Sequence, residues 1–253
     1  MVDVGGDEEE VRLAVRIATG VAGDDELEPL GAWMLMGTEA PERRVHHHRT
    51  ADYCAGVTNT TLLLALRDPG DPPYHPLPAP VQELLLTLDA PPRLAAHLRV
   101  VHDVAHQLVT WTERCCPALR FDPEAVLFGA ATHDIGKVIH IAELSRPGSA
   151  HEEAGRDLLL AQGISPELAR FAGTHAAWTQ PGIGVEGLLV STADKVWKNK
   201  RVPELEDLLV ARLAAAAGQL AWEVFMALDE ALEHIGDGSA HRLAFQSAYP
   251  LHG

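Results

Sequence analysis

Residues 131–137 read ATHDIGK, and they place two residue types that bind metal ions side by side. His133 and Asp134 are adjacent, and Lys137, the first lysine of the chain, follows three residues later. Side chains of neighbouring helical residues diverge by about 100°, so both can reach one ion only where a helix ends. Gly136 permits the backbone to end a helix at this point. The segment therefore predicts a metal site at a helix C-terminus or, in the simpler interpretation, a capped helix end with two polar residues in solvent.

The helical pattern before this pair ends in an apolar run, AVLFGAA at residues 125–131. A helix that is apolar around its circumference is buried, so its end should lie in or near the core. Two polar side chains carried into the core favour a bound ion over a solvated helix end, because buried polar groups need partners.

A further candidate ligand, His97, occurs in a long helical pattern over residues 93–115. His102 and His106 fall off the inward stripe of this helix, so we expect them at the surface or the rim, with His102 as the substitute ligand if the register differs. A single inward histidine is more often a hydrogen-bonded core residue than a ligand, so His97 by itself predicts little. His97 belongs to the inward stripe because apolar residues follow it at helical spacing: Val101, Val104, Ala105 and Leu108.

The order of these residues resembles that of a known family. His97, the His133–Asp134 pair and a distal Asp194 in the segment STADKVW match the pattern of the HD-domain superfamily of metal-dependent phosphohydrolases, which is named for its His-Asp pair. The resemblance extends over about residues 80–235. It implies a mainly α fold, a helical bundle in which these four side chains bind one divalent metal ion at the centre, with Asp134 taking part in catalysis.

Two further histidines resemble those of the dinuclear members of that superfamily. His151 lies in GSAHEEAG, in the first turn of an expected helix, and His175 ends another expected helix in FAGTHAAW. By the resemblance, Asp134 would bridge two ions, and His151 and His175 would complete the second one; otherwise both are ordinary histidines at helix ends. Ligation by histidine and aspartate suits a divalent Fe, Mn, Zn, Co or Ni ion, and ligand types alone do not select among these metals.

The lysines indicate the charge of the substrate. The chain has four, Lys137, Lys195, Lys198 and Lys200, and each lies within six residues of a proposed ligand, with Arg201 beside the last of them. In so acidic a protein, this placement predicts the binding of a phosphate or a similar anion. Lys137 is the strongest candidate, because the resemblance implies that this lysine contacts the substrate anion or assists the leaving group. The segment KNKR could equally be a solvated helix end.

The leading functional hypothesis is hydrolysis of a phosphomonoester, phosphodiester or anhydride in a small metabolite or nucleotide by a metal-activated hydroxide. Two ions about 3.5–4 Å apart can generate that nucleophile and neutralise the charge that develops on the phosphoryl oxygens. The sequence lacks the GYP tripeptide and the paired histidines of the cyclic-di-GMP enzymes, since Ala176 follows His175, which argues against that substrate. The alternative is an HD-domain mixed-valent di-iron oxygenase that cleaves a small polar substrate, because it would use the same ligand set.

Composition and charge argue against two kinds of binding partner, nucleic acid and anionic membranes. The chain has 253 residues and a formal net charge of -16, which argues against binding to nucleic acid or to an anionic membrane, because both attract basic surfaces. No uncharged apolar run approaches the roughly 20 residues that span a bilayer, and the start of the chain has no signal-peptide pattern, so we expect a cytoplasmic protein. Its three cysteines, Cys54, Cys115 and Cys116, do not form a disulfide framework.

The elements that must position the candidate ligands are helices, because helical spacing recurs from about residue 81 to the end of the chain. Capping signals predict three helix starts: Asp122 before Pro123, Ser165 before Pro166, and Ser149 with Glu152 as a capping box.

The C-terminal helices could also bury a homodimer interface, although a single-chain bundle would show the same pattern.

A proline- and glycine-rich segment, RDPGDPPYHPLPAP at residues 67–80, predicts a domain boundary. We expect an N-terminal region of unknown function over residues 1–75, an appendage that could be α+β, and an HD-domain helical bundle with C-terminal helices over residues 80–253. Just before the boundary, VTNTTLLLALR could be a strand or a helix. The N-terminal region also allows a third hypothesis, a metal-binding interaction module that uses His46–His48 and Cys54, although consecutive side chains diverge and a polar loop is the simpler interpretation.

Overall fold

The computed structural model describes residues 59–252 of the chain. Over that range the protein consists of ten α-helices and two short 3-10 helices, without a β-strand, which confirms the mainly α fold predicted from the sequence. None of these helices between residues 59 and 252 is both long and apolar enough to cross a membrane. The elements are α2 Thr60–Arg67, α3 Ala79–Thr87, α4 Pro92–Cys115, α5 Pro123–Thr132, η1 Ile135–Val138, η2 Ile141–Leu144, α6 Ala150–Ala161, α7 Pro166–Thr174, α8 Val185–Val196, α9 Pro203–Ala217, α10 Ala221–Asp237 and α11 Ser239–Ser247.

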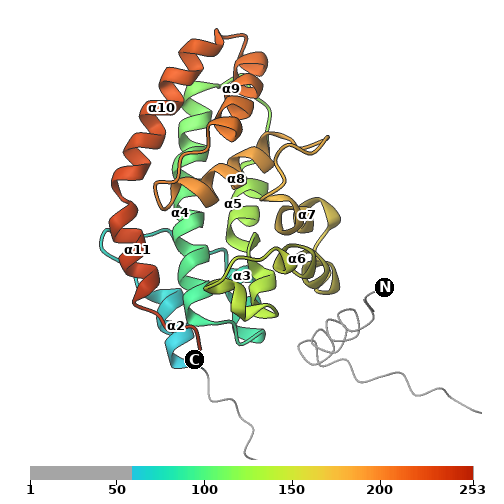
Figure 1. Ribbon diagram of the computed structural model, residues 1–253, viewed down its shortest axis with the longest axis vertical. Helices are drawn as coiled ribbons and strands as arrows, with labels where there is room; N and C mark the ends of the chain where they lie inside the picture. Colours follow the sequence, from blue (N-terminus) through green and yellow to red (C-terminus); the bar gives the residue numbers. More distant parts are fainter. Residues whose placement is uncertain (1–58, 253) are drawn as a thin grey trace, which may run out of the picture.

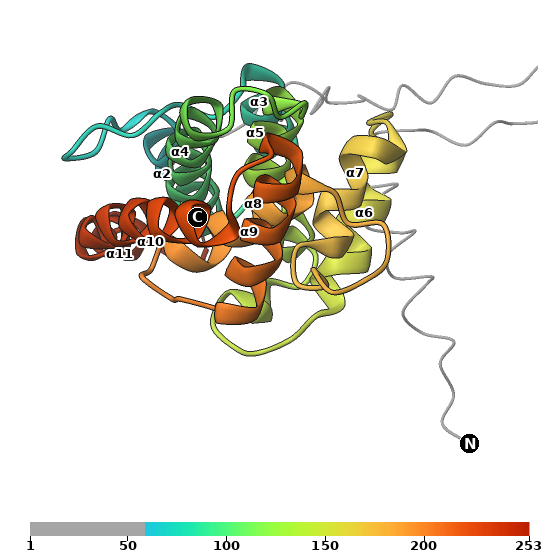
Figure 2. The same ribbon diagram turned by 90° about the horizontal axis from the view of Figure 1, so that it is seen from above.

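Helix α4 is the central element of the bundle. It packs against α2, α5, α8, α10 and α11. Figure 1 shows α10 and α11 along one flank of α4, with α5, α6 and α7 on the opposite flank. The view from above in Figure 2 shows the same order, with α6 and α7 farthest from α10 and α11. Helices therefore cover α4 on two opposite sides.

More residues of α4 are buried than the inward stripe that its sequence predicts. The predicted inward residues, such as Val101 and Leu108, are fully buried. His102 is buried as well, with a relative exposure of 2%, so its predicted place at the surface or rim is wrong. The ring of His102 lies against that of His106, with the ring centroids 4.7 Å apart. His106 is partly buried, as expected for the rim.

The segment before the proline-rich stretch forms helix α2. The side chain of Asn59 caps it by accepting the N–H of Leu62 at 3.0 Å. Leu62 and Ala65 are buried in the same core cluster as Leu98 of α4. The guanidinium of Arg99 in α4 also donates a hydrogen bond of 2.8 Å to the carbonyl oxygen of Ala65. Helix α2 is thus part of the core that the rest of the bundle shares.

The division of the chain near residue 80 stays a prediction, because residues 1–58 lie outside the described residues. The candidate metal ligands His46–His48 and Cys54 belong to that part of the chain. Their predicted role as a separate interaction module is therefore not developed further.

The start of α6 differs from the capping box predicted for it. Ser149 occupies the N-cap position, but its side chain accepts no capping hydrogen bond from any residue of the described range. The carboxylate of Glu143 takes that place, because it accepts the N–H groups of Ala150 and His151, each at 3.2 Å. A charged carboxylate is the stronger acceptor for the exposed N–H groups at a helix N-terminus. The predicted capping box is therefore wrong, although the helix begins where it was expected.

Candidate metal centre

Helix α5 carries the His-Asp pair into the core. It begins at its predicted N-cap, Asp122, whose carboxylate accepts the N–H of Ala125 at 3.2 Å. It ends at Thr132, and the chain then continues into η1. Between the two elements His133 keeps helical backbone angles, whereas Asp134 adopts φ -106° and ψ 13°. This break turns two neighbouring side chains toward a common point, as the sequence predicted.

Gly136 follows the pair for a reason other than the one predicted. It is not among the glycines with positive φ in residues 59–252, so the helix end does not depend on its backbone freedom. Instead, η1 packs against α6 with backbone against backbone. A Cβ on Gly136 would overlap the carbonyl oxygen of His151 and lie 2.6 Å from the backbone nitrogen of Gly155. The missing side chain lets α6 approach, which brings His151 near Asp134.

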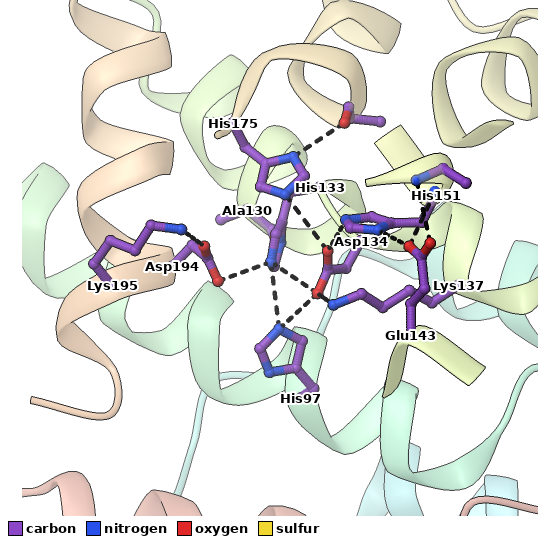
Figure 3. Close-up of polar contacts among 12 residues, drawn as sticks. His97, Ala130, His133, Asp134, Lys137, Glu143, His151, His175, Asp194 and Lys195 are labelled. Carbon is purple, nitrogen blue, oxygen red and sulfur yellow. Dashed lines mark hydrogen bonds and ion pairs between the residues drawn. The ribbon is translucent and has the colours of Figure 1, made fainter. Parts of the chain in front are cut away.

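The six ligands predicted from the sequence converge in one buried cluster. Each of the six residues has a relative exposure of 8% or less. They come from helices that are distant in the sequence, and Figure 3 shows their side chains pointing toward one another. His97 lies in α4, His133 and Asp134 at the end of α5, His151 in the first turn of α6, His175 at the end of α7, and Asp194 in α8.

Asp134 lies at the centre of this cluster (Figure 3). Its Oδ2 atom lies 3.1 Å from Nε2 of His97 and 3.5 Å from Nε2 of His133. Its Oδ1 atom lies 3.0 Å from Nε2 of His151 and 3.5 Å from Nε2 of His175. The two oxygens of one carboxylate therefore face two different pairs of histidines.

The ligand atoms accordingly form two groups that share Asp134. Asp194 adjoins the first group, because its Oδ1 atom lies 3.4 Å from Nε2 of His133. Nitrogen and oxygen ligands about 2.0–2.2 Å from one metal ion lie within about 4 Å of each other, so spacings of this size fit a divalent ion in each group. In both groups the ligand atoms lie within 4.8 Å of one another: His97, His133 and Asp134 in the first, and Asp134, His151 and His175 in the second.

The imidazole rings are oriented by acceptors at their other nitrogen. Nδ1 of His133 lies 2.9 Å from the carbonyl oxygen of Ala130, and Nδ1 of His175 lies 3.0 Å from that of Ala172. A hydrogen on each Nδ1 atom leaves the lone pair on Nε2, which faces Asp134. Nε2 of His151 is buried and makes no hydrogen bond with correct geometry to any described residue. An inward nitrogen without such a partner fits a metal ligand.

The electrostatics of the cluster favour an ionised Asp134 and neutral imidazoles at His97 and His175. Burial alone would raise the pKa of Asp134, but the adjacent imidazoles of His133, His151 and His97 hold it well below its usual range. Burial, reinforced by His133, lowers the pKa of His175 to about 4. Burial also lowers the pKa of His97. At His151, burial acts to lower the pKa, but the carboxylates of Asp134 and Glu143 outweigh it and raise the pKa. Ionised carboxylates and neutral imidazoles are the forms that coordinate a metal ion, so the donor set suits one.

Two of the predicted substrate-binding lysines reach the cluster. Nζ of Lys137 lies 2.6 Å from Oδ2 of Asp134, and its side chain is 17% exposed. Nζ of Lys195 lies 2.5 Å from Oδ2 of Asp194 and 5.6 Å from the centre of the Trp178 ring. Both ammonium groups therefore lie at the border between the buried carboxylates and solvent.

The other predicted cations lie farther out. Lys198 and Lys200 are exposed, and Nζ of Lys198 lies over the Trp197 ring at 5.5 Å. The guanidinium of Arg201 donates two hydrogen bonds to Glu206, at 2.9 and 2.7 Å, and one of 2.7 Å to Asp229. Arg201 thus joins α9 to α10 through two carboxylates, and its role in substrate binding stays a prediction.

Sequence reasoning missed one residue of the cluster, Glu143 in η2. Its carboxylate lies 2.5 Å from Nδ1 of His151, and its side chain is 14% exposed. The only local signal was an acidic residue a few positions before a candidate ligand, and the apparent capping box at Ser149 already explained the helix start. The contact depends on how η2 folds back onto α6, which no local pattern encodes.

Comparison with known proteins agrees with this geometry. Residues 94–217 match the HD domain family, and the matched range contains all six candidate ligands. No curated protein and no solved structure gives a significant match to the chain. The family match and the buried His/Asp cluster that could hold a divalent ion point to the same conclusion. The chain belongs to the HD-domain superfamily, which is a superfamily of metal-dependent hydrolases.

Proposed function

We propose that this protein is a phosphohydrolase that uses two divalent metal ions to hydrolyse a small phosphorylated metabolite or nucleotide. The bond cleaved would be a phosphomonoester, a phosphodiester or a phosphoanhydride. The observation that carries the proposal is the arrangement around Asp134, whose two carboxylate oxygens face different pairs of buried histidines. A carboxylate placed in this way can bridge two ions, which is the arrangement that clamps a phosphoryl group.

The proposal divides the ligands between two ions that share Asp134. Divalent ions in this position would neutralise charge on a phosphoryl group and would lower the pKa of a water molecule. Iron, manganese, zinc, cobalt and nickel all suit this set of nitrogen and oxygen ligands. His97, His133, Asp134 and Asp194 would hold one ion, and Asp134, His151 and His175 would hold the other.

The lysines support a phosphorylated substrate. Lys137 and Lys195 place ammonium groups beside the carboxylates of Asp134 and Asp194, at the open border of the cluster. We assign Lys137 to a phosphoryl oxygen of the substrate, where its charge would oppose the negative charge that grows as the phosphoryl group transfers. Lys195 would bind a second oxygen of the same group. Lys198, Lys200 and Arg201 remain candidates for contacts with more distant parts of the substrate.

An activity screen tests the proposal directly. The metal-free protein is supplied with Mn, Co, Ni or Fe and assayed against phosphomonoesters, phosphodiesters and nucleotides, with Asp134→Ala as the comparison. Metal-dependent release of phosphate, abolished in the variant, is the expected result. Turnover that requires oxygen and accompanies a mixed-valent di-iron signal would overturn it in favour of the alternative, an HD-domain di-iron oxygenase with the same ligand set.

A further inference from the structure

Among the described residues, the carboxylate of Glu143 makes three polar contacts, and all of them are with the first two residues of α6. Its Oε1 atom accepts the N–H of Ala150 at 3.2 Å, and its Oε2 atom accepts the N–H of His151 at 3.2 Å. Oε2 also lies 2.5 Å from Nδ1 of the His151 ring. One carboxylate therefore fixes both the backbone and the side chain of His151 (Figure 3).

His151 needs an acceptor from outside its own helix. His133 and His175 stand at helix C-termini, so the carbonyl oxygens three residues earlier, those of Ala130 and Ala172, reach their Nδ1 atoms. His151 stands in the first turn of α6, where the residue three positions earlier is Gly148 and precedes the helix. The carbonyl groups of a helix point toward its C-terminus, so no helical carbonyl oxygen faces a side chain in the first turn. A side chain has to supply the acceptor, and Glu143 does so.

The chain around Glu143 is folded closely onto its carboxylate. A Cβ on Gly148 would overlap the carboxylate group of Glu143, so the connection between η2 and α6 passes directly over it. The side chain of Glu143 is 14% exposed, and that of His151 is 6% exposed. Packing and three polar contacts together leave the carboxylate little freedom to move.

The consequence for His151 is a defined ring orientation. A hydrogen on Nδ1, donated to Glu143, leaves the lone pair on Nε2. Nε2 lies 3.0 Å from Oδ1 of Asp134. The negative charge of the Glu143 carboxylate beside Nδ1 also makes the ring a stronger electron donor at Nε2. Carboxylate-histidine pairs support metal ions in other proteins in the same way.

We propose that Glu143 is a positioning residue for the metal ion held by Asp134, His151 and His175: it orients His151 and strengthens its Nε2 atom as a ligand. The inference rests on the two-ion centre of the proposed function. It assigns Glu143 no contact with the substrate and no ligand bond of its own.

Metal binding without substrate tests this role, so the result does not depend on turnover. The full chain is freed of metal, titrated with Mn²⁺ or Co²⁺, and analysed for bound ions per chain and for the dissociation constant of each ion. Glu143→Gln keeps the size and one acceptor oxygen, whereas Glu143→Ala removes the whole group. We expect one of the two ions, the one assigned to His151 and His175, to lose affinity by about 10- to 100-fold in Glu143→Gln and by more in Glu143→Ala, with the affinity for the other ion unchanged.

A matched control separates positioning from a general effect of negative charge at the start of α6. Glu153 lies in the first turn of the same helix with a side chain that is 79% exposed, and it contacts Arg156 rather than His151. Glu153→Gln removes a negative charge from the same helix end and should leave both metal affinities unchanged. Circular dichroism and thermal unfolding show whether each variant is folded.

Two results would overturn the inference. One is unchanged affinity for both ions in Glu143→Ala and Glu143→Gln, which would leave Glu143 only a capping role. The other is binding of a single ion by the unsubstituted chain, because the second ion that Glu143 is proposed to support would then not exist. A chain that binds two ions with the expected loss in the Glu143 variants, but hydrolyses no phosphate ester, would instead contradict the proposed function alone.

Discussion

The imidazole of His151 and the carboxylate of Asp134 lie 3.0 Å apart because α6 and η1, which carry or adjoin them, touch backbone to backbone at Gly136. The contact joins the two groups of candidate ligands, since Asp134 belongs to both. The geometry of the centre therefore depends on a residue that has no side chain.

Gly136→Ala should separate these two elements. The new Cβ would overlap the carbonyl oxygen of His151, and backbone cannot move aside as a flexible side chain can. We expect the free energy of unfolding, measured with urea, to fall by about 1–3 kcal/mol, and the number of bound metal ions to fall as well. Gly173→Ala is the control: its Cβ would meet Arg156 at an ordinary 3.6 Å, so the change in stability should stay below about 1 kcal/mol. Equal effects of the two substitutions would contradict this account.

Asp134→Asn should remove both ions, whereas His151→Ala should remove one. The amide keeps the volume of the carboxylate but loses the charge that both groups of ligands share. Elemental analysis of the purified variants gives the ions per chain. We expect hydrolysis of any substrate found to fall by at least about 100-fold in Asp134→Asn. Two ions retained in Asp134→Asn would exclude Asp134 as the bridge.

Lys137→Met and Arg201→Met should affect different properties. Lys137 lies beside Asp134 with its ammonium near the open border, so its loss should lower kcat by about 100-fold while the protein stays folded and keeps its metal. Arg201 is bound by Glu206 and Asp229, so its loss should lower the free energy of unfolding by about 1 kcal/mol and leave kcat nearly unchanged. Steady-state kinetics and urea unfolding on both variants make the comparison. A larger loss of kcat in Arg201→Met than in Lys137→Met would reverse the assignment.

The metal-free protein should lose stability in acid partly through His102. Burial, together with the charges of His106 and His75, lowers the pKa of His102 to about 3, and neither ring nitrogen has a hydrogen-bond partner among residues 59–252. An unfolded histidine binds a proton below its ordinary pKa of about 6.5. Between these two pKa values the unfolded chain binds the proton and the folded chain does not, so the free energy of unfolding falls as the pH falls from about 6.5 toward 3.

Substitution of His102 measures that contribution. His102→Leu loses no hydrogen bond and removes the group that titrates. Both proteins should lose stability between pH 7 and pH 4. The decrease in the free energy of unfolding should be smaller in His102→Leu than in the unsubstituted protein, by on the order of 2 kcal/mol. His241 is exposed, so His241→Gln should leave the acid dependence unchanged. Parallel pH dependences for His102→Leu and the unsubstituted protein would show that His102 does not contribute.

The candidate ligands were predicted from the sequence in two ways: local helical pattern indicated His97, His133 and Asp134, and the resemblance to the HD-domain superfamily added His151, His175 and Asp194. Helical spacing placed His97 on an inward stripe, and the break after an apolar helix turned His133 and Asp134 toward a common point. His151 and His175 do lie at the helix ends where they were expected, but their assignment as ligands came from the resemblance to the dinuclear members of the superfamily. Local backbone preferences act over a few residues, so one chain segment carries enough information to predict them.

The tertiary structure determined the role of those residues that act through contact with a distant segment of the chain. His102 is buried although the pattern of its own helix predicts a polar position at the surface or rim. Gly136 is required by the approach of α6, and Arg201 is engaged by a carboxylate from α10. Glu143 reaches His151 only because η2 folds back over the start of α6. Such contacts join segments whose relative placement is set by the packing of the whole core. The sequence by itself therefore determined the candidate ligands and the fold class, and only the assembled bundle determined what orients those side chains.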